Sequence, residues 1–329
     1  MTPRATVALL NWNGGDFVRP CIESVLAQTE RSIEIVVIDN HSTDGSVDVI
    51  EHLLGPSRVH HNVVRLGENR GICGGLQVAL DRAAGEYFFP FASDDEMQPD
   101  RVQIQCDQLD EAGSTTHVAA GAVALIGPDG RALRGWSRRP LIRRPPRYRG
   151  SDPAANLAFS LKVPPAPGLV FRTAGLRAIG GYDTSAPVED IDTFTRMVLL
   201  GGSKVVTTNK VVSRYRRHGS NASSRRDVMG EGLEHTLRTL VQSEVDVGQV
   251  RARWLEYLDA RDRGYTSPWS ALLGTVAAQP LDKGEVRAAG RNVVRSSQMS
   301  AGRRSRALVA IAAPAVAARR YGRVNGWGK

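Results

Sequence analysis

The chain has 329 residues, enough for one large domain with an appended segment or for two domains, and its 41% hydrophobic content is ordinary for a soluble globular protein. Its three cysteines (Cys21, Cys73 and Cys106) lie far apart without CxxC spacing, which argues against a disulfide framework or a zinc site and favours a reducing compartment. The formal net charge of +9 is unevenly distributed, because residues 131–150 hold eight arginines and residues 303–329 hold six arginines and one lysine, with no acidic residue in either segment.

These two basic segments indicate where anionic partners are expected. Together they carry more positive charge than the whole chain, so the remainder is net acidic. A local excess of arginine suits a diphosphate, anionic lipid headgroups or nucleic acid, and solvated surface arginine is the alternative interpretation. Trp136 and Tyr148 are interleaved with the first set of arginines, as in nucleic-acid binding, but we expect only an accessory role there and no nucleic-acid partner.

Apolar runs of strand length alternate with helical patterns over the first 112 residues. Strands are expected at residues 5–10, 33–38, 63–66 and 87–91. Helices are expected at residues 17–28 and 46–54, and two further helices are expected to end near residues 84 and 112. The continuous Val/Ile run at residues 33–38 is typical of a parallel strand that is covered on both faces. Four such alternations predict the α/β class, with a Rossmann-like, mostly parallel sheet flanked by helices.

The regular alternation stops after a further strand at residues 117–126. Residues 127–168 are rich in Pro, Gly and Arg, and we expect a long, flexible, basic loop that orders over bound substrate as a lid. Beyond it, a strand is expected at residues 169–172, helices at residues 173–179 and 188–200, and edge strands at residues 204–206 and 211–215. This pattern predicts one domain over residues 1–225 and a helical C-terminal extension over residues 226–329 with a basic end.

Both ends of the chain bear on its location. The N-terminus leads directly into a strand-like run without a secretory h-region, so cytoplasmic residence is expected. Residues 307–318 are mostly small and apolar, but a helix that spans a bilayer needs about 20 residues. This segment either packs as a terminal helix or lies in a membrane interface, which makes residues 303–329 a candidate peripheral contact on the inner face of the membrane.

Three consecutive acids follow the strand expected at residues 87–91. Asp94, Asp95 and Glu96 are expected near the carboxyl end of this strand, where an open α/β sheet usually faces its ligand. Like charges this close repel one another, so the cluster favours a nearby cation. Hard oxygen ligands suit Mg²⁺ or Mn²⁺, particularly beside a diphosphate, whereas a solvated turn that caps the next helix is the alternative.

Seven short motifs follow one another in an order that resembles the family 2 glycosyltransferases, an inverting group with the GT-A fold. The motifs are Asn-Trp-Asn from residue 11, Val-Ile-Asp-Asn-His-Ser-Thr-Asp from residue 37, Glu-Asn-Arg-Gly from residue 68, Ser-Asp-Asp from residue 93, Gly-Gly-Tyr-Asp from residue 180, Glu-Asp from residue 189 and Arg-Arg-His from residue 216. The resemblance covers roughly residues 5–225. It implies a GT-A glycosyltransferase catalytic domain over residues 1–225 and nothing about the extension.

The resemblance implies nucleotide-binding roles for the ends of the first two strands. Asn11, Trp12 and Asn13 match the cradle of the nucleotide base, where Trp12 either packs on a base or ribose or fills the core. Asp39 and Asn40 match the pair that reads the base and ribose. Many relatives have two acids there, so the amide of Asn40 leaves the base open, with UDP- and dTDP-sugars as the expected donors.

Three arginines and one acid are expected to contact the rest of the donor. Arg70, in a glycine-bearing turn after a strand, matches a nucleotide or diphosphate contact. Arg216 and Arg217 suit phosphate oxygens, because a guanidinium binds them in a forked geometry. Asp94 is expected to face the sugar or ribose.

The resemblance also assigns the metal and the general base. Asp95 matches the acid that contacts the metal, Mn²⁺ or Mg²⁺, and His218 matches an element that in some relatives contacts the metal or diphosphate, with a structural role as the alternative. Asp190 in the Glu189-Asp190 pair matches the base that removes the acceptor proton, and Asp192 is a second candidate. A positioned base of this kind supplies roughly 10²–10⁴ in rate.

The predicted function is therefore metal-dependent, inverting transfer of a sugar from a nucleoside diphosphate to an acceptor hydroxyl, in cell-surface glycan or glycolipid assembly. The acceptor is a glycan, a lipid-linked saccharide or a small molecule. A sugar-phosphate nucleotidyltransferase is the alternative, although residues 11–16 lack the basic residue that such enzymes usually carry there. A dehydrogenase is disfavoured because the glycines at residues 71–75 do not follow the GxGxxG pattern.

Overall fold

The structure of the protein is a computed structural model that describes residues 2–134, 140–145, 163–221 and 225–243. Its strands are β1 (Ala5–Asn11), β2 (Ile33–Asp39), β3 (His60–Arg65), β4 (Tyr87–Ala92), β5 (Glu96–Met97), β6 (Thr116–Ile126), β7 (Ile142–Arg143), β8 (Leu169–Arg172) and β9 (Lys204–Arg216). Its α-helices are α1 (Val18–Leu26), α2 (Ser46–Leu54), α3 (Gly71–Arg82), α4 (Arg101–Ala112), α6 (Thr173–Ala178), α7 (Glu189–Leu199) and α8 (Arg226–Gln242). The described residues up to 236 form one compact unit.

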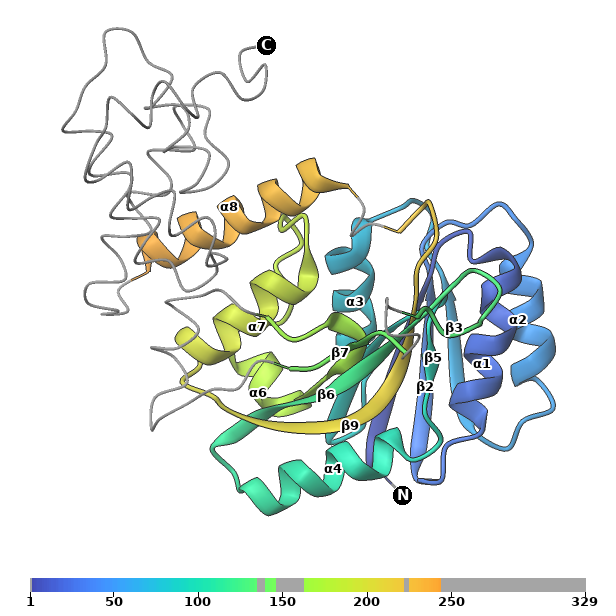
Figure 1. Ribbon diagram of the computed structural model, residues 1–329, viewed down its shortest axis with the longest axis horizontal. Coiled ribbons are helices and arrows are strands. Elements are labelled where there is room, and N and C mark those ends of the chain that lie inside the picture. The colour runs from blue at the N-terminus through green and yellow to red at the C-terminus, as the bar shows by residue number, and fades with distance from the viewer. Residues whose placement is uncertain (1, 135–139, 146–162, 222–224, 244–329) are drawn as a thin grey trace, which may run out of the picture. The chain divides into compact units, whose positions relative to one another are not determined.

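The strands of the described residues form one mixed sheet in the order β3-β2-β1-β4-β8-β6-β9-β5, with β7 paired on β6 (Figure 1). β1 is parallel to β2 and β4, β2 is parallel to β3, and β6 is parallel to β9. The short strand β8 runs antiparallel to both β4 and β6 and so joins two parallel sets. The predicted α/β class, with a sheet flanked by helices, is confirmed.

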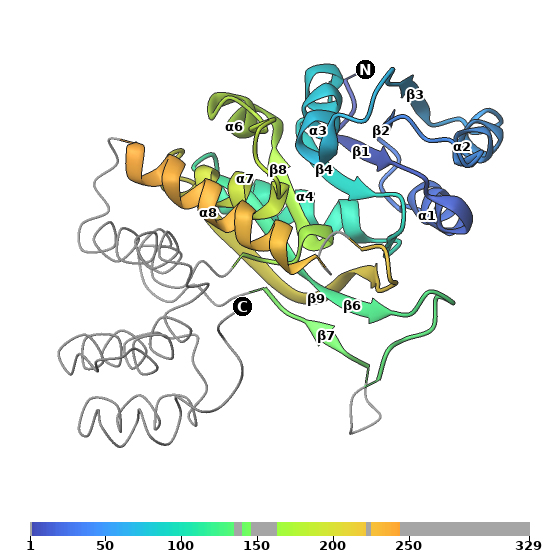
Figure 2. The ribbon, with the colours of Figure 1, turned by 90° about the horizontal axis from the view of Figure 1, so that it is seen from above.

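The two faces of β1 and β2 are covered by different helices, and Figure 2 shows α3 on the opposite side from α1. β2 is buried along its whole length, as expected for a parallel strand covered on both faces. The main apolar core includes Leu9 of β1, Ile22 of α1 and Ile50 of α2. On the other face, α3 approaches β1 closely because Gly75 lacks a side chain, and a Cβ there would lie 2.4 Å from Leu10 Cδ1.

One strand prediction is wrong. The two edge strands expected at residues 204–206 and 211–215 are a single strand, β9, which lies between β6 and β5 rather than at the edge. Its pairing with β6 shifts register at three places, so the exposed polar stretch around residues 207–210 is absorbed as an irregularity of the strand. That polar stretch made one strand look like two.

The basic segment at residues 127–168 is not wholly a loop. It contains β7, which pairs antiparallel with β6, and a 3₁₀ turn at Ala166–Gly168. Residues 135–139 and 146–162, with much of the expected lid, lie outside the described residues. So does the apolar run at residues 307–318, and within the described residues no helix is long and apolar enough to cross a membrane. The division at residues 225 and 226 stays a prediction.

Candidate active site

The ends of β1 and β2 meet at one edge of the sheet, as parallel strands require. Asn11 and Asp39 are paired residues at these ends, and Asn11 Nδ2 donates to Asp39 Oδ1 at 2.9 Å. The same nitrogen lies 2.8 Å from Ser46 Oγ and 3.1 Å from Ser42 Oγ. Both Asn11 and Asp39 are buried, so Asn11 holds the strand end together from within, and it is not an exposed part of a base cradle.

Among the remaining predicted nucleotide contacts, Trp12, Asn13 and Arg70 are exposed. Trp12 is 58% exposed, which is wrong for a core residue and suitable for packing on a base. The Arg70 side chain is about half exposed and lies near Glu68. Asn40, in contrast, is buried, and its amide donates to Asn69 Oδ1 and Gly71 O and accepts from Arg70 N. Asn40 therefore fixes the turn that presents Arg70.

Asn13 is placed differently from its neighbour Trp12. Its backbone N–H donates to Ser42 Oγ at 2.9 Å, and its side-chain oxygen accepts from Thr43 N at 2.9 Å. Asn13 thus links the turn after β1 to the turn after β2. Its backbone φ of +50° is one that asparagine tolerates better than most residues.

The acidic cluster lies just beyond β4 and meets the end of β9. Asp94 Oδ2 lies 2.8 Å from His218 Nε2 and 3.3 Å from Asn221 Nδ2. Asp95 is buried, and its Oδ1 accepts from the backbone N–H of Arg216 at 2.8 Å. Burial and the neighbouring charge of Asp94 raise the pKa of Asp95 well above its ordinary value. A carboxyl in this position gains from an added cation.

Arg216 supports the acidic cluster and does not extend toward a phosphate. Its buried guanidinium donates to the backbone oxygens of Asp94, Gly127 and Pro128 and to the carboxylate of Glu96. The expected phosphate contact is therefore wrong for Arg216. Glu96 also pairs with Arg214, a network that the sequence analysis did not foresee. The guanidinium of Arg217 lies over the ring of Tyr215 at 5.5 Å.

Phe17 is a second residue that the sequence analysis missed. Its ring lies 4.8 Å from the ring of His218 and 5.1 Å from the Arg216 guanidinium, so it packs against both groups that hold Asp94. Its position at the start of the helix that follows the Asn-Trp-Asn turn is the feature of the sequence that could have indicated a place near the site. Phe17 gives His218 a fixed orientation toward the acidic cluster.

Asp95, Glu189 and Asp190 line one cavity that is partly open to solvent. Its walls come from the ends of β1 and β4, from α3, from β8 and from the start of α7, and they are mostly apolar. Apolar residues on these walls include Leu10, Leu76, Phe91 and Phe171. The predicted metal ligand Asp95 and the predicted general base Asp190 therefore line the same cavity.

Glu189 and Asp190 begin α7, where acids are favoured by the helix dipole. Burial and the charge of Asp190 raise the pKa of Glu189 above its ordinary value. Burial also raises the pKa of Asp190, although the backbone N–H of Ile191, 2.7 Å from Asp190 Oδ1, lowers it in part. Two adjacent carboxyls with raised pKa values form a pair that holds and releases a proton near neutral pH.

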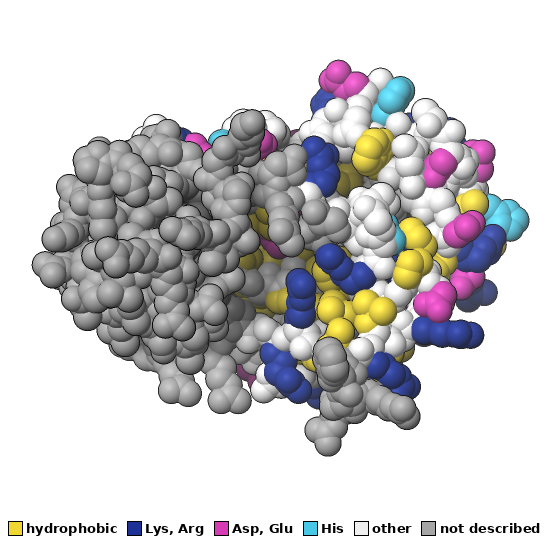
Figure 3. Space-filling view, turned by 45° about the horizontal axis from the view of Figure 1, so that its top comes forward, with side chains coloured by type: hydrophobic (Ala, Val, Ile, Leu, Met, Phe, Trp, Pro, Cys, Tyr) yellow, Lys and Arg dark blue, Asp and Glu magenta, His cyan; other side chains and the backbone are white. Residues whose placement is uncertain are grey.

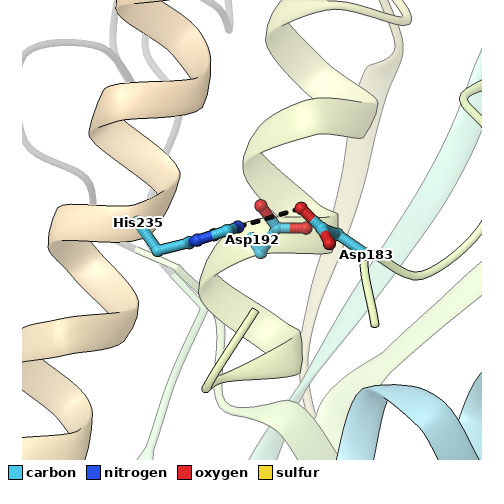
Figure 4. Close-up of side chains that lie close together, drawn as sticks. All are labelled: Asp183, Asp192 and His235. Atoms are coloured by element: carbon cyan, nitrogen blue, oxygen red, sulfur yellow. Dashed lines mark hydrogen bonds and ion pairs between the residues drawn. The ribbon is translucent and has the colours of Figure 1, made fainter. Parts of the chain in front are cut away.

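Asp183, Asp192 and His235 form a second titratable cluster, shown in Figure 4, whose potential ligand atoms lie within 4.8 Å of one another. Protein groups already occupy much of it: Asp183 pairs with His235 at 2.9 Å, and Asp192 pairs with Arg196 at 2.7 Å. Burial raises the pKa of Asp183, but hydrogen bonds from Ser185 and His235 outweigh it and bring the value to about 2. We interpret the cluster as an ion-pair network that anchors α7 to the turn before it.

Arginines and apolar side chains are gathered on one face of the described part (Figure 3). Among the described residues of the segment 131–145, exposed arginines are Arg131, Arg134, Arg143 and Arg144, and exposed large apolar residues are Leu141 and Ile142. This exposure suits the anionic partner expected for the segment.

Comparison with known proteins shows which protein family this chain is similar to. Residues 6–167 match the model of the family described as glycosyl transferase family 2. The chain is 32% identical over 143 residues to the succinoglycan biosynthesis protein ExoO of Rhizobium meliloti (strain 1021), covering 44% of this chain and 40% of ExoO. It is 32% identical over 110 residues to the putative teichuronic acid biosynthesis glycosyltransferase TuaG of Bacillus subtilis (strain 168), covering 33% of this chain and 43% of TuaG. The chain thus spans less than half the length of these relatives.

Solved structures show the same fold. S. aureus TarS 1–349 in complex with UDP-GlcNAc superposes with a TM-score of 0.60 at 18% identity, covering 97% of this chain and 90% of that one. The mannosyltransferase PcManGT from Pyrobaculum calidifontis, in complex with GDP-Man and Mn²⁺, superposes with a TM-score of 0.59 at 18% identity, covering 98% of this chain and 87% of that one. Both are glycosyltransferases with the GT-A fold, and this likeness confirms the predicted fold.

Proposed function

We propose that the protein is an inverting glycosyltransferase that moves a sugar from a nucleoside diphosphate to an acceptor hydroxyl, because residues 6–167 match the model of glycosyl transferase family 2. The observation that carries this proposal is the cavity lined by Asp95, which follows β4, and by Glu189 and Asp190, which begin α7. Inversion needs a leaving group and a base on opposite faces of the anomeric carbon. A cavity whose carboxyls come from two different elements suits that requirement.

Asp190 is the proposed general base. An acceptor hydroxyl must lose its proton as it attacks, and a carboxylate within hydrogen-bond reach accepts that proton. Its raised pKa brings Asp190 closer to the operating pH, which makes it a stronger base than an ordinary aspartate. Glu189, whose pKa is raised further, stays mostly protonated beside it and limits the repulsion within the pair.

The donor is proposed to lie along the ends of β1, β2 and β4. Exposed Trp12 packs on the base, and Asp39 is the proposed ribose contact, although its carboxylate is buried and already accepts from Asn11 Nδ2 and Ser42 N. The side chains of Arg70 and Arg217 are the proposed diphosphate contacts. The two solved neighbours are complexes with UDP-GlcNAc and GDP-Man, and for this chain we propose a UDP- or dTDP-sugar as donor.

We propose that a divalent cation binds beside Asp95, although the described acids and histidine whose ligand atoms already converge within 4.8 Å are Asp183, Asp192 and His235. The donor set comprises the carboxylates of Asp94 and Asp95 and the imidazole of His218, which suits Mn²⁺ or Mg²⁺. The raised pKa of buried Asp95 means that its ionised form lacks a sufficient counter-charge in the protein alone, and a bound cation would supply one. When bound, such an ion offsets the charge of the departing diphosphate. Asp94, Asp95 and His218 would hold it, while Arg216 fixes the backbone that carries both acids.

The biological setting is proposed from the names of the relatives, which include succinoglycan and teichuronic acid biosynthesis. We propose cell-surface glycan or glycolipid assembly in the cytoplasm, with residues 1–225 as the catalytic domain and residues 226–329 as a helical extension. Residues 303–329 are a proposed peripheral membrane contact. The acceptor is a glycan, a lipid-linked saccharide or a small molecule.

The proposal is tested by measuring release of nucleoside diphosphate from a panel of nucleotide sugars with Mn²⁺ present. Wild type should turn over at least one donor, and Asp95→Asn should lose at least two orders of magnitude of activity while keeping its fold. Arg19→Gln, which removes an exposed surface arginine, is the control and should behave as wild type. Equal turnover by Asp95→Asn and wild type would refute the assignment.

A further inference from the structure

Two buried hydroxyls in the cavity wall have no role in the function described so far. Tyr182 is 4% exposed and Thr193 is 1% exposed, and both line the cavity that contains Asp95 and Asp190. Among the described residues, neither Tyr182 Oη nor Thr193 Oγ1 has a hydrogen-bond partner. Leaving a buried hydroxyl unpaired costs stability, so two such groups on one cavity call for an explanation.

Both the backbone around Tyr182 and its ring are held in place by neighbouring groups. Its own backbone N–H donates to Gln77 Oε1 at 2.8 Å, and the preceding carbonyl of Gly181 accepts from Arg196 at 2.7 Å. The ring packs against Phe88 with centroids 6.1 Å apart. Burial and the charge of Glu189 raise the pKa of Tyr182, so its phenol stays protonated and available as a donor. The hydroxyl is thus presented on a rigid support.

Thr193 presents its hydroxyl from α7, one turn beyond the Glu189-Asp190 pair. Its helical neighbour two positions on, Thr195, is equally buried, and within the described residues its Oγ1 also has no partner. Thr195 does not line the cavity. The two threonines differ in whether a ligand in the cavity can reach the hydroxyl, so Thr195 is a matched control.

Apart from these two hydroxyls and the carboxyls of Asp95, Glu189 and Asp190, the cavity wall is apolar. A ligand that fits it needs an apolar face and a few hydroxyls, which is the surface of a sugar ring with its C–H and O–H groups. We propose that Tyr182 and Thr193 bind hydroxyl groups of a sugar ring that sits between Asp95 and Asp190. This inference rests on the proposed function, and the sugar is either the transferred residue of the donor or the acceptor residue.

The test compares Tyr182→Phe, Thr193→Val and the control Thr195→Val with wild type. Each of the first two should lower kcat/KM by about three- to tenfold, the usual effect of one neutral hydrogen bond, whereas Thr195→Val should stay within about twofold. All three should unfold at the wild-type temperature or above it, because an unpaired hydroxyl is replaced by an apolar group of similar shape.

Calorimetry then distinguishes the two sources of the sugar. The panel starts with UDP-GlcNAc and GDP-mannose, and each donor is compared with its free nucleoside diphosphate. A contact with the transferred sugar weakens binding of the nucleotide sugar in Tyr182→Phe but leaves the free diphosphate unchanged. A contact with the acceptor leaves both affinities unchanged and raises KM for the acceptor. Deoxygenated sugars should lose affinity for wild type but not further for the variant that lacks the partner hydroxyl.

Two results would overturn the inference and leave the proposed function standing. One is wild-type kinetics and affinities in both Tyr182→Phe and Thr193→Val while Asp95→Asn is inactive. The other is an equal loss in all three variants together with a lower unfolding temperature, which would mean a structural role. Binding of no nucleotide sugar from the panel would contradict the proposed function itself, and this inference with it.

Discussion

Replacing Asp190 by asparagine should remove the activity and increase the stability of the protein. Asparagine keeps the size of the side chain and its acceptor for the Ile191 N–H, but it cannot take a proton. Loss of a general base lowers kcat by roughly 10²–10⁴. Release of nucleoside diphosphate in the presence of acceptor measures this loss, and the fold is checked by circular dichroism.

The stability gain follows from the pKa of Asp190. Burial raises it from 3.8 to about 6, so the folded protein holds this proton more tightly than the unfolded chain does. As pH rises from about 4 to 6, the unfolded carboxyl ionises first, and stability falls; above pH 6 the full cost is present. At 1.36 kcal/mol per pKa unit the cost is at most about 3 kcal/mol.

The control for this prediction is Asp192→Asn on the same helix. Asp192 is fully buried and pairs with Arg196 at 2.7 Å, so the substitution leaves a buried guanidinium without its counter-charge. Burial also raises the pKa of Asp192, but the loss of the counter-charge of Arg196 should outweigh this and make the variant less stable than wild type. Thermal unfolding at pH 7.5 should therefore move Asp190→Asn upward and Asp192→Asn downward. An inactive Asp190→Asn that is also much less stable than wild type would refute the reasoning, because its inactivity would then come from a damaged fold.

Three further predictions follow from the same structure. The kcat/KM of wild type should rise with pH through about 6 and then level off, as the Glu189-Asp190 pair ionises, and a pH-independent rate between 5 and 7 would contradict this. Removing divalent cations with EDTA should abolish transfer, and Mn²⁺ or Mg²⁺ should restore it; full activity in EDTA would exclude the proposed cation. Gly181→Ala should destabilise the fold by at least about 1 kcal/mol in denaturant titration, because Gly181 has a φ of +73° and a Cβ there would lie 2.3 Å from Gln77 Oε1; wild-type stability would show that the turn relaxes.

The sequence predicted the strand ends well because their signals are local. Asp39 and Asp94 follow continuous apolar runs, and parallel pairing then brings such ends to one edge of the sheet. The role of Arg216 was not predictable in the same way. Its partners Asp94 and Gly127 lie 122 and 89 residues away, and only the course of β9 past β5 and β6 brings them together. Contacts of this range leave no periodic pattern in the sequence.

The predicted roles of the asparagines illustrate a second limit. Asn11 and Asn40 match positions that suggest nucleotide contact, yet both are buried and their amides bind protein groups. A motif records that a residue type is needed at a position, but it does not say whether the side chain faces the ligand or supports the loop that does. The unpaired hydroxyls of Tyr182 and Thr193 were equally hidden, since burial and missing partners are properties of the folded chain.

The central claim is that one cavity holds the donor between a cation at Asp95 and a base at Asp190. The most direct measurement is a crystal structure of the protein with a nucleotide sugar that it turns over and Mn²⁺. The account predicts the ion on the Asp95 carboxylate and the anomeric carbon of the sugar facing Asp190 across the cavity. An ion or a sugar bound away from both carboxyls would contradict it.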